Sequence, residues 1–495
     1  MGERMFEAIE LNQKLSKSQY KQEEQHFRSE LLKIQRELSK ENIATLIIVA
    51  GMEGSGKGEV VDNLNKWFDN RGIETHAFWD ETDEETQRPE YWRFWKRLPA
   101  RSKMAIMFGG WYWDPIYQYA EGVINDNALV EKAQRIKAFE NMLAEDGLVI
   151  VKLWFHLPKK VFKKHIVHRS AANMHVATSL HSESVSKHFK KFTVSAEKMI
   201  RYTNTAELPW HLIEASDANY RDASVGRALL SSLQQHLHER RVYDRRSLEP
   251  GPNIENTEQL LDQVDLTLQL AQEEHKKQLK TYQAKLNELA WRAYGAKRSA
   301  VIVFEGWDAA GKGGAIRRLT NAMDARLYRS ISVAAPTDEE LAHHYLWRFW
   351  RQLPRAGYMT LYDRSWYGRV LVERVEGLAM AHEWQRAYQE INGFEEQLIE
   401  SGVTVIKFWM HISPEEQLKR FEQRKATPWK QHKLTEEDWR NRDKWQAYTQ
   451  AVNDMVLHTS IDKAPWHIVA ANDKYLARVN VIKTVCERLA HALSK

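Results

Sequence analysis

Two stretches of the chain combine glycine, lysine and a carboxylate in the spacing of a phosphate-binding loop. GWDAAGKG begins at Gly306 and GMEGSGKG begins at Gly51. Glycines let such a loop wrap closely around phosphate oxygens, and the helix that follows adds the positive end of its dipole. The spacing predicts phosphate contacts from Gly306, Gly311, Lys312 and Gly313, with first-half counterparts at Gly51, Gly56 and Lys57.

Both loops lack the Ser or Thr that normally follows the lysine and holds Mg²⁺. Gly313 and Gly58 stand at that position. Asp308 lies inside the second loop, and Asp363 ends the apolar run YMTLYD, where P-loop enzymes present a metal-binding carboxylate. We therefore predict Asp308 and Asp363 as Mg²⁺ ligands. The alternative is that Asp308 caps the next helix and Asp363 only ends a strand.

The loops belong to a tandem repeat. An offset of 255 residues superposes WRFWKRLP, from Trp92, on WRFWRQLP, from Trp347. PWHLIEASD, from Pro209, matches PWHIVAAND, from Pro465, at an offset of 256. A period of this length indicates duplicated domains. We predict domains at residues 1–245 and 246–495, with a linker near 240–257.

The two halves differ where chemistry would occur. LYDRSWYGR, residues 361–369, resembles the stretch that contains MFGGWYWDP, residues 107–115. At the offset of 255, Asp363 and Arg364 are replaced by Phe108 and Gly109. Phosphoryl transfer depends on positioning and on neutralising charge, so this loss should disable chemistry and spare the fold. The second half is predicted to be catalytic, through Asp308, Lys312, Asp363 and Arg364. The first is predicted to be degenerate, with Glu53, Lys57, Arg93 and Arg169 as counterparts.

A basic segment follows at residues 419–444, where nine Lys or Arg accompany five Asp or Glu. We predict a lid whose bases Arg424, Lys425, Lys430 and Lys433 bind phosphate; a solvated helix face is the alternative. Arg424 matches Arg169, but the three lysines match Ser170, His175 and Thr178. The half that lacks Asp-Arg therefore also has fewer basic residues in this segment, which favours phosphate binding over a solvated helix face. Arg348, like Arg93, is predicted either to contact phosphate or to pack at the edge of the core.

The elements that position these residues follow from the apolar pattern. TLIIVAG and AVIVFEG are buried-strand segments that end in the loop glycine. Long amphipathic helices are predicted at residues 3–41 and 258–294, and short apolar runs then alternate with helical patterns. Such alternation predicts a parallel sheet with helices on both faces. The expected fold is two tandem α/β domains of P-loop type with three α/β/α layers.

Composition narrows the class of protein. The 495 residues carry a net charge of only +5, so no global excess of positive charge indicates nucleic acid or a membrane as partner. Apolar runs are too short to span a bilayer. The single cysteine, Cys486, excludes an intramolecular disulfide and predicts a reducing compartment, the cytoplasm. A homo-oligomer and an intramolecular pseudo-dimer of the two halves both remain open.

Four segments, EGWDAAGKGG, YLWRFWRQLP, LYDRSWYGRVLVERV and APWHIVAANDK, together resemble the polyphosphate kinase 2 family. The tandem arrangement with one altered half resembles its two-domain polyphosphate:AMP phosphotransferases. The resemblance implies a thymidylate-kinase-like fold, Mg²⁺ dependence, inorganic polyphosphate as donor and AMP as acceptor, with ADP as product. It implies functional roles for Asp308, Lys312, Asp363 and Arg364, and a lid that holds the polyphosphate chain.

Three other functions remain as alternatives. An ATP-dependent nucleotide kinase shares the loop and the lid, and a nucleoside diphosphate kinase driven by polyphosphate differs only in its acceptor. A non-enzymatic protein that binds polyanions or RNA would use the basic lid without chemistry. The carboxylates of the second half argue against this last class, because acidic groups hinder simple anion binding.

Overall fold

The computed structural model describes residues 5–78, 80–171, 188–243, 260–428, 431 and 436–494. The chain forms two compact units. The first comprises Met1–Asp80, Arg93–Leu248 and Asp338–His344, and the second comprises Glu81–Trp92, Glu249–Thr337 and Tyr345–Lys495. The predicted boundary between residues 245 and 246 lies outside the described residues and stays a prediction.

The second unit is built on a parallel five-stranded sheet in the order β10-β9-β6-β8-β7. The strands are β6 (Ala300–Gly306), β7 (Tyr328–Ser332), β8 (Met359–Asp363), β9 (Thr404–His411) and β10 (Trp466–Ala470). The central strand β6 is buried along nearly its whole length, which explains its continuous apolar run. Because the strands are parallel, the phosphate loop after β6 and Asp363 at the end of β8 lie at the same edge of the sheet.

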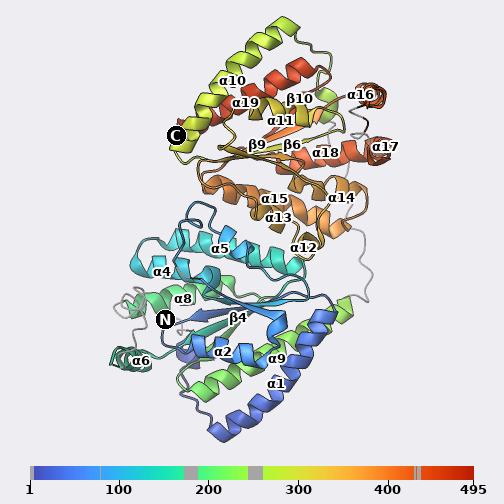
Figure 1. The fold of residues 1–495 in the computed structure, drawn as a ribbon. Helices are drawn as coiled ribbons and strands as arrows, with labels where there is room; N and C mark the ends of the chain where they lie inside the picture. The colour runs from blue at the N-terminus through green and yellow to red at the C-terminus, as the bar shows by residue number, and fades with distance from the viewer. Residues whose placement is uncertain are drawn as a thin grey trace. The chain divides into compact units, whose positions relative to one another are not determined.

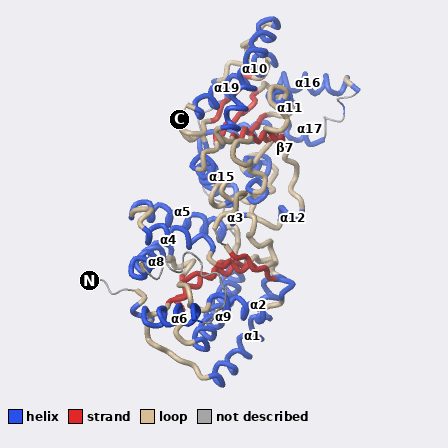
Figure 2. The backbone as a smooth tube through the Cα atoms, turned by 60° about the vertical axis from the view of Figure 1, so that its left-hand side comes forward, coloured by secondary structure: helices blue, strands red, loops and turns tan. Residues whose placement is uncertain are grey.

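Helices cover both faces of this sheet (Figures 1 and 2). One face carries α10 (Gln272–Gly295), α11 (Lys312–Thr320) and α19 (Lys474–Leu493). The other carries α13 (Trp347–Trp350), α14 (Val372–Val375), α15 (Ala381–Glu400) and α18 (Trp445–Thr459). The remaining elements of the second half are η4 (Leu260–Gln263), α12 (Asp338–Leu341), η5 (Trp366–Arg369), α16 (Pro414–Ala426) and α17 (Glu436–Asp443).

The first unit repeats this plan with the sheet order β2-β3-β1-β4-β5, again parallel. Its strands are β1 (Thr45–Gly51), β2 (Ile73–Ala77), β3 (Met104–Phe108), β4 (Val149–His156) and β5 (Trp210–Glu214). Its helices are η1 (Glu7–Ile9), α1 (Lys17–Lys40), α2 (Lys57–Trp67), η2 (Asn70–Gly72), α3 (Trp92–Trp95), η3 (Gly110–Tyr112), α4 (Trp113–Glu121), α5 (Asp126–Glu145), α6 (Lys159–Ala171), α8 (Phe189–Thr203) and α9 (Ala218–Tyr243).

The predicted fold class, two α/β units with helix-covered parallel sheets, is confirmed, but the predicted starts of the long helices are wrong. The helix expected from residue 3 begins at Lys17, because the Ser16 side chain accepts from the Gln19 amide and forms a capping box. The helix expected from residue 258 begins at Gln272, after Ala271, whose ψ of 142° is not helical. In both cases a residue with a non-helical backbone sets the start of the helix, although the amphipathic pattern extends further toward the N-terminus.

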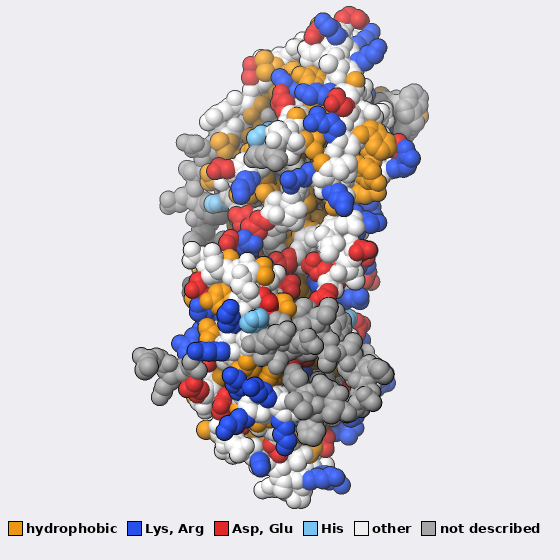
Figure 3. Space-filling model, turned by 90° about the vertical axis from the view of Figure 1, so that its left-hand side faces the viewer, with side chains coloured by type: hydrophobic (Ala, Val, Ile, Leu, Met, Phe, Trp, Pro, Cys, Tyr) orange, Lys and Arg blue, Asp and Glu red, His pale blue; other side chains and the backbone are white. Residues whose placement is uncertain are grey.

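Charge is mixed over the described part of the face that Figure 3 shows. On the face shown in Figure 3, Lys and Arg side chains alternate with Asp and Glu, in line with the small net charge. Among the described residues, no helix is long and apolar enough to cross a membrane.

Candidate active site

The loop between β6 and α11 has a backbone that requires glycine at its first residue. Gly306 has φ of +147°, and a Cβ there would lie 2.5 Å from the carbonyl oxygen of Met410. Gly311, with φ of +108°, is the N-cap of α11, and no described side chain caps this helix. A helix N-terminus without a side-chain cap can bind an anion, and phosphate binding at this turn stays a prediction.

Lys312 is held inside this loop. Its Nζ atom donates to the carbonyl oxygens of Gly306, at 2.6 Å, and Trp307, at 3.2 Å. The side chain is only partly buried, so the ammonium group stays within reach of a phosphate that occupies the loop.

Asp308 is engaged by two residues from elsewhere in the unit. Its Oδ1 atom accepts from Arg364 Nη2 at 3.3 Å, and its Oδ2 atom accepts from Asn441 Nδ2, on α17, at 2.9 Å. The alternative role, a cap for the next helix, does not apply, because the N-cap of α11 is Gly311 and carries no side-chain cap. Asp308 therefore connects the phosphate loop to both the end of β8 and the lid.

Asp363 lies beside the residue that replaces the usual hydroxyl. Its Oδ2 atom is 3.8 Å from the position that a Cβ of Gly313 would take. The carboxylate thus approaches the first turn of α11, where other P-loops place a Ser or Thr. The structure brings Asp308, Lys312 and Asp363 to the same edge of the sheet.

Arg364 adopts a left-handed backbone, with φ of +65°. Its amide donates to the carbonyl oxygen of Phe304 at 3.0 Å, which fixes the turn after β8 to the neighbouring strand. Burial alone would lower the pKa of its guanidinium, but surrounding carboxylates, with Asp308 foremost, raise that pKa above its ordinary value. Arg364 stays charged and faces the loop.

Glu305 is a site residue that the sequence analysis missed. It is 5% exposed, and its Oε1 atom accepts a hydrogen bond from Ser365 Oγ at 2.8 Å. Burial raises the pKa of this carboxyl, and the Ser365 hydroxyl and the charge of Lys312 oppose that rise. A signal was present, because the first half has Ala50 and Gly110 at the two matching positions. The pair is absent from the half that also lacks Asp-Arg.

The lid segment is only partly described. Arg424 and Lys425 lie in the last turn of α16, whereas Lys430 and Lys433 lie outside the described residues. Arg420, which shares a helix face with Arg424 in the sequence pattern, is 3% exposed and donates to the carbonyl oxygens of Ala309, Ala310, Ala471 and Asn472. It braces the phosphate loop. Arg348 lies on α13 and donates to the carbonyl oxygen of Ala334 at 3.0 Å.

The first-half loop has the same backbone with different surroundings. Gly51 has φ of +143°, and a Cβ there would lie 2.4 Å from the Phe155 carbonyl oxygen. Lys57 is 7% exposed and donates to the carbonyl oxygen of Gly51 at 2.6 Å and to Glu53 at 3.4 Å. The ring centroids of Phe108 and Trp113 lie 5.8 and 5.6 Å from its Nζ atom. Phe108 and Trp113 match Asp363 and Gly368, so an aromatic ring lies near this lysine where the second half has the strand-end carboxylate.

Arg93 and Arg169 are the two other first-half counterparts. The Arg93 guanidinium lies 5.2 Å from the ring centroid of Phe78. Arg169 belongs to α6, and its side chain lies outside the described part of the structure.

A family model, Polyphosphate kinase 2 (PPK2), matches residues 14–241 and again residues 269–495. The chain belongs to this family. Both halves match separately, which agrees with the duplicated loops and sheets described above.

Relatives of this polyphosphate kinase 2 chain match it over its full length. A polyphosphate:AMP phosphotransferase of Pseudomonas aeruginosa is 43% identical over 99% of this chain and 100% of its own. One from Pseudomonas syringae pv. tomato is 44% identical, over 99% of each chain. A crystal structure of a polyphosphate kinase 2 protein from Pseudomonas aeruginosa PA01 superposes with a TM-score of 0.89, at 42% identity, and covers 99% of this chain and 100% of that one.

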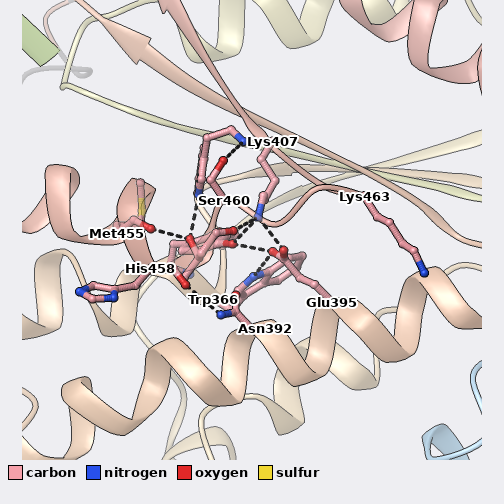
Figure 4. Close-up of polar contacts among 12 residues, drawn as sticks. Trp366, Asn392, Glu395, Lys407, Met455, His458, Ser460 and Lys463 are labelled. Atoms are coloured by element: carbon pink, nitrogen blue, oxygen red, sulfur yellow. Dashed lines mark hydrogen bonds and ion pairs between the residues drawn. The ribbon is translucent and has the colours of Figure 1, made fainter. Parts of the chain in front are cut away.

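The Trp-Tyr pair that both halves keep has a structural role in this polyphosphate kinase 2 chain (Figure 4). Trp366 Nε1 and Tyr367 OH donate to Glu395 Oε1 at 3.1 and 2.6 Å. Lys407 Nζ donates to Glu395 Oε2 at 2.7 Å and to the Thr459 carbonyl oxygen at 2.6 Å. Glu395 and Lys407 are 0% exposed. This buried cluster fixes the segment that follows Asp363 and Arg364.

The first half contains the same buried cluster. Trp111 Nε1 and Tyr112 OH donate to Glu140 Oε1 at 3.0 and 2.6 Å. Lys152 Nζ donates to Glu140 Oε2 at 2.9 Å and to the Thr203 carbonyl oxygen at 2.8 Å. The Trp-Tyr pair therefore serves the fold in both halves, whereas Asp363, Arg364 and Ser365 occur only in the second half, where the first has Phe108, Gly109 and Gly110.

Proposed function

We propose that the second half transfers the terminal phosphoryl group of inorganic polyphosphate to the phosphate of AMP and so forms ADP. The observation that carries the proposal is the convergence of Lys312, Asp308 and Arg364 on one phosphate loop, in a chain whose full-length relatives are named polyphosphate:AMP phosphotransferases. The bond from the bridging oxygen to the terminal phosphorus of polyphosphate breaks, and an oxygen of AMP forms the new bond. The donor leaves one phosphate shorter.

The residues of the chain supply position and positive charge. Amides of the first turn of α11 and Lys312 bind the donor phosphates, and Arg364 neutralises charge that builds up on the transferred group. The acceptor oxygen of AMP is already anionic, so the reaction requires no base to remove a proton. Asn441 links Asp308 to α17 and thereby ties the loop to the lid.

Mg²⁺ fits the donor set at this site. Magnesium in phosphoryl-transfer sites is usually held by one or two carboxylates together with substrate phosphates. Within the described residues, no group of three or more His, Cys, Asp or Glu side chains could hold a metal ion. In this part of the chain, a metal ion would therefore need ligands from the substrate as well as from the protein. Asp308 and Asp363 would hold the ion. When bound, it would offset negative charge on the donor phosphates.

The first half is proposed to be structural or regulatory and without phosphoryl transfer of its own. Phe108 and Gly109 occupy the positions of Asp363 and Arg364, and Glu53 pairs with Lys57. The loop therefore lacks the arginine and the strand-end carboxylate that the mechanism needs.

The test is phosphorus NMR of the full-length protein with Mg²⁺, AMP and polyphosphate in the absence of ATP. ADP signals that appear together with shortening of the polyphosphate would support the proposal. If ADP formed only after ATP was added, the protein would be an ordinary nucleotide kinase. ATP produced from added ADP, without any conversion of AMP, would instead identify nucleoside diphosphates as the acceptors.

A further inference from the structure

Two arginines meet at the first turn of α11, beside the phosphate loop. Arg318 Nη1 donates to the carbonyl oxygen of Gly314 at 3.2 Å. Arg478 comes from α19, and its Nη2 atom lies 4.0 Å from the position that a Cβ of Gly314 would take. Both side chains are half-buried, and neither forms an ion pair with a carboxylate in the part of the chain that the structure describes.

The positive charge of this pair is incompletely balanced. Burial, followed by the charges of Arg318 and Arg420, lowers the pKa of Arg478, and Tyr475 and Asp473 oppose this only in part. The Asp473 carboxylate is already used, because it accepts the Leu476 amide at 2.7 Å and caps α19. Burial and the charges of Arg478 and Arg318 also lower the pKa of His275, on α10. An anion at this place would relieve the repulsion.

The first half has the opposite arrangement at the matching positions. Asn63 stands for Arg318 and Asp222 stands for Arg478, and Asn63 Nδ2 donates to Asp222 Oδ2 at 2.9 Å. Glu59 stands for Gly314 and pairs with Arg221 at 2.9 Å. The half without the Asp-Arg turn is therefore also without the pair of arginines, so the two features occur together.

The location of the pair indicates which phosphates it could reach. In P-loop proteins the lysine reaches the two terminal phosphates, and the loop amides also cradle the phosphate that precedes them. In ATP that preceding phosphate carries ribose and adenine, whereas in polyphosphate it carries further phosphates. Gly314 lies in the first turn of α11, two residues after Lys312.

We infer that Arg318 and Arg478 form a subsite for the phosphates beyond the two that Lys312 reaches, and that this subsite favours a long polyphosphate over a nucleoside triphosphate as donor. The inference rests on the proposed function. It extends the phosphate site from the loop to the place where α19 passes the first turn of α11.

The test compares Arg318→Gln/Arg478→Gln with a control of equal charge, Arg292→Gln/Arg326→Gln. Arg292 and Arg326 are exposed, pair with Glu288 and Asp324, and lie close to the starts of β6 and β7, at the opposite edge of the sheet. Equilibrium binding of long-chain polyphosphate and of tripolyphosphate is measured in EDTA without AMP. The KM values for long-chain polyphosphate and for AMP are measured with Mg²⁺.

Loss of two charge-assisted contacts should weaken binding of long-chain polyphosphate, and raise its KM, about tenfold or more. Binding of tripolyphosphate should weaken much less, and the KM for AMP should not change. An equal loss for both donors, or a loss no larger than in the control, would overturn the inference. If the double variant fails to fold, Arg478→Gln alone is compared with Arg326→Gln.

The binding measurement separates this inference from the proposed function. A wild-type protein that binds long polyphosphate but makes no ADP would refute the proposed reaction, and the comparison of the two donors would still decide whether the subsite exists.

Discussion

Trp307, in the phosphate loop, stacks on Trp445, the first residue of α18, with ring centroids 3.7 Å apart and ring planes 9° apart. The indole of Trp307 also donates to His411 Nδ1 at 3.0 Å. The stack joins the loop to the helix that follows the lid, so the loop is held from the lid side as well as from the sheet.

Trp445→Ala should lower kcat/KM for polyphosphate about three- to tenfold, because a stacked aromatic pair contributes roughly 0.5–1.5 kcal/mol beyond its buried area. Steady-state kinetics on purified protein would measure the loss. Trp445→Phe, which keeps a ring, is the control and should retain most activity. Equal losses in both variants would show that the stack does not position the loop.

Asp363→Asn should reduce turnover at least about a hundredfold, the size of effect seen when one transition-state electrostatic contact is removed. Lys57→Met, in the first half, should leave most of the activity. Initial rates of ADP formation measure both, with circular dichroism as a check on folding. Activity retained by Asp363→Asn and lost by Lys57→Met would place the chemistry in the first half.

Glu305 and Ser365 should act as a unit that positions the turn after β8. Ser365→Ala and Glu305→Ala should each lower kcat about tenfold with little change in KM for AMP. The double variant, which removes both polar side chains as Ala50 and Gly110 do in the first half, should be hardly worse than either single variant, because residues in contact are non-additive. Glu305→Gln keeps an acceptor and should be milder than Glu305→Ala. Additive effects in the double variant would contradict a shared role.

The buried pair Glu395–Lys407 should contribute to the free energy of unfolding of the second unit. Lys407→Met leaves the Glu395 charge without its partner and should reduce the free energy of unfolding by about 3–5 kcal/mol. Urea denaturation measures the change. Replacing both residues, Glu395→Gln with Lys407→Met, should recover part of the loss. Lys152→Met in the first half should destabilise its own unit to a similar extent. If the cluster served catalysis only, neither substitution would change stability in this way.

Acid should destabilise the second unit through His411. Burial lowers the pKa of His411 from 6.5 to about 4, and its neutral Nδ1 accepts the Trp307 indole proton. The unfolded chain therefore takes up the proton first as pH falls, and up to about 3 kcal/mol of stability is lost between pH 6.5 and 4. His411→Asn keeps an acceptor without titrating there. Thermal unfolding at pH 7.5 and pH 5 should show a smaller pH effect in this variant than in the wild type.

Much of the site follows from sequence because its determinants are local. The glycine spacing fixes the loop, and the offset of 255 residues exposes the substitution of Asp363 and Arg364. Glu305 was missed because a glutamate at the end of an apolar strand carries no spacing signal, although Ala50 marked the difference. Asn441 reaches Asp308 across 133 residues of sequence, a contact that only tertiary packing creates.

Arg420 shows the converse limit. Its sequence neighbours indicate a basic face, yet its guanidinium is directed inward onto four carbonyl oxygens. The sequence pattern alone does not distinguish an arginine exposed to solvent from a buried arginine that holds a loop, because both faces of a short helix can carry arginine.

The left-handed backbone at Arg364 has a consequence for how the two halves can change. The matching residue, Gly109, has φ of +88°, so both turns place a residue with positive φ directly after the strand. A side chain there costs about 1–2 kcal/mol that glycine avoids. Selection for robustness alone would thus drive position 364 toward glycine, and only the demand for a cation opposes it. In a half that no longer needs the cation, glycine can replace the arginine at this position and remove the backbone strain. The reverse substitution would cost stability, so the unit would need enough stability to tolerate it.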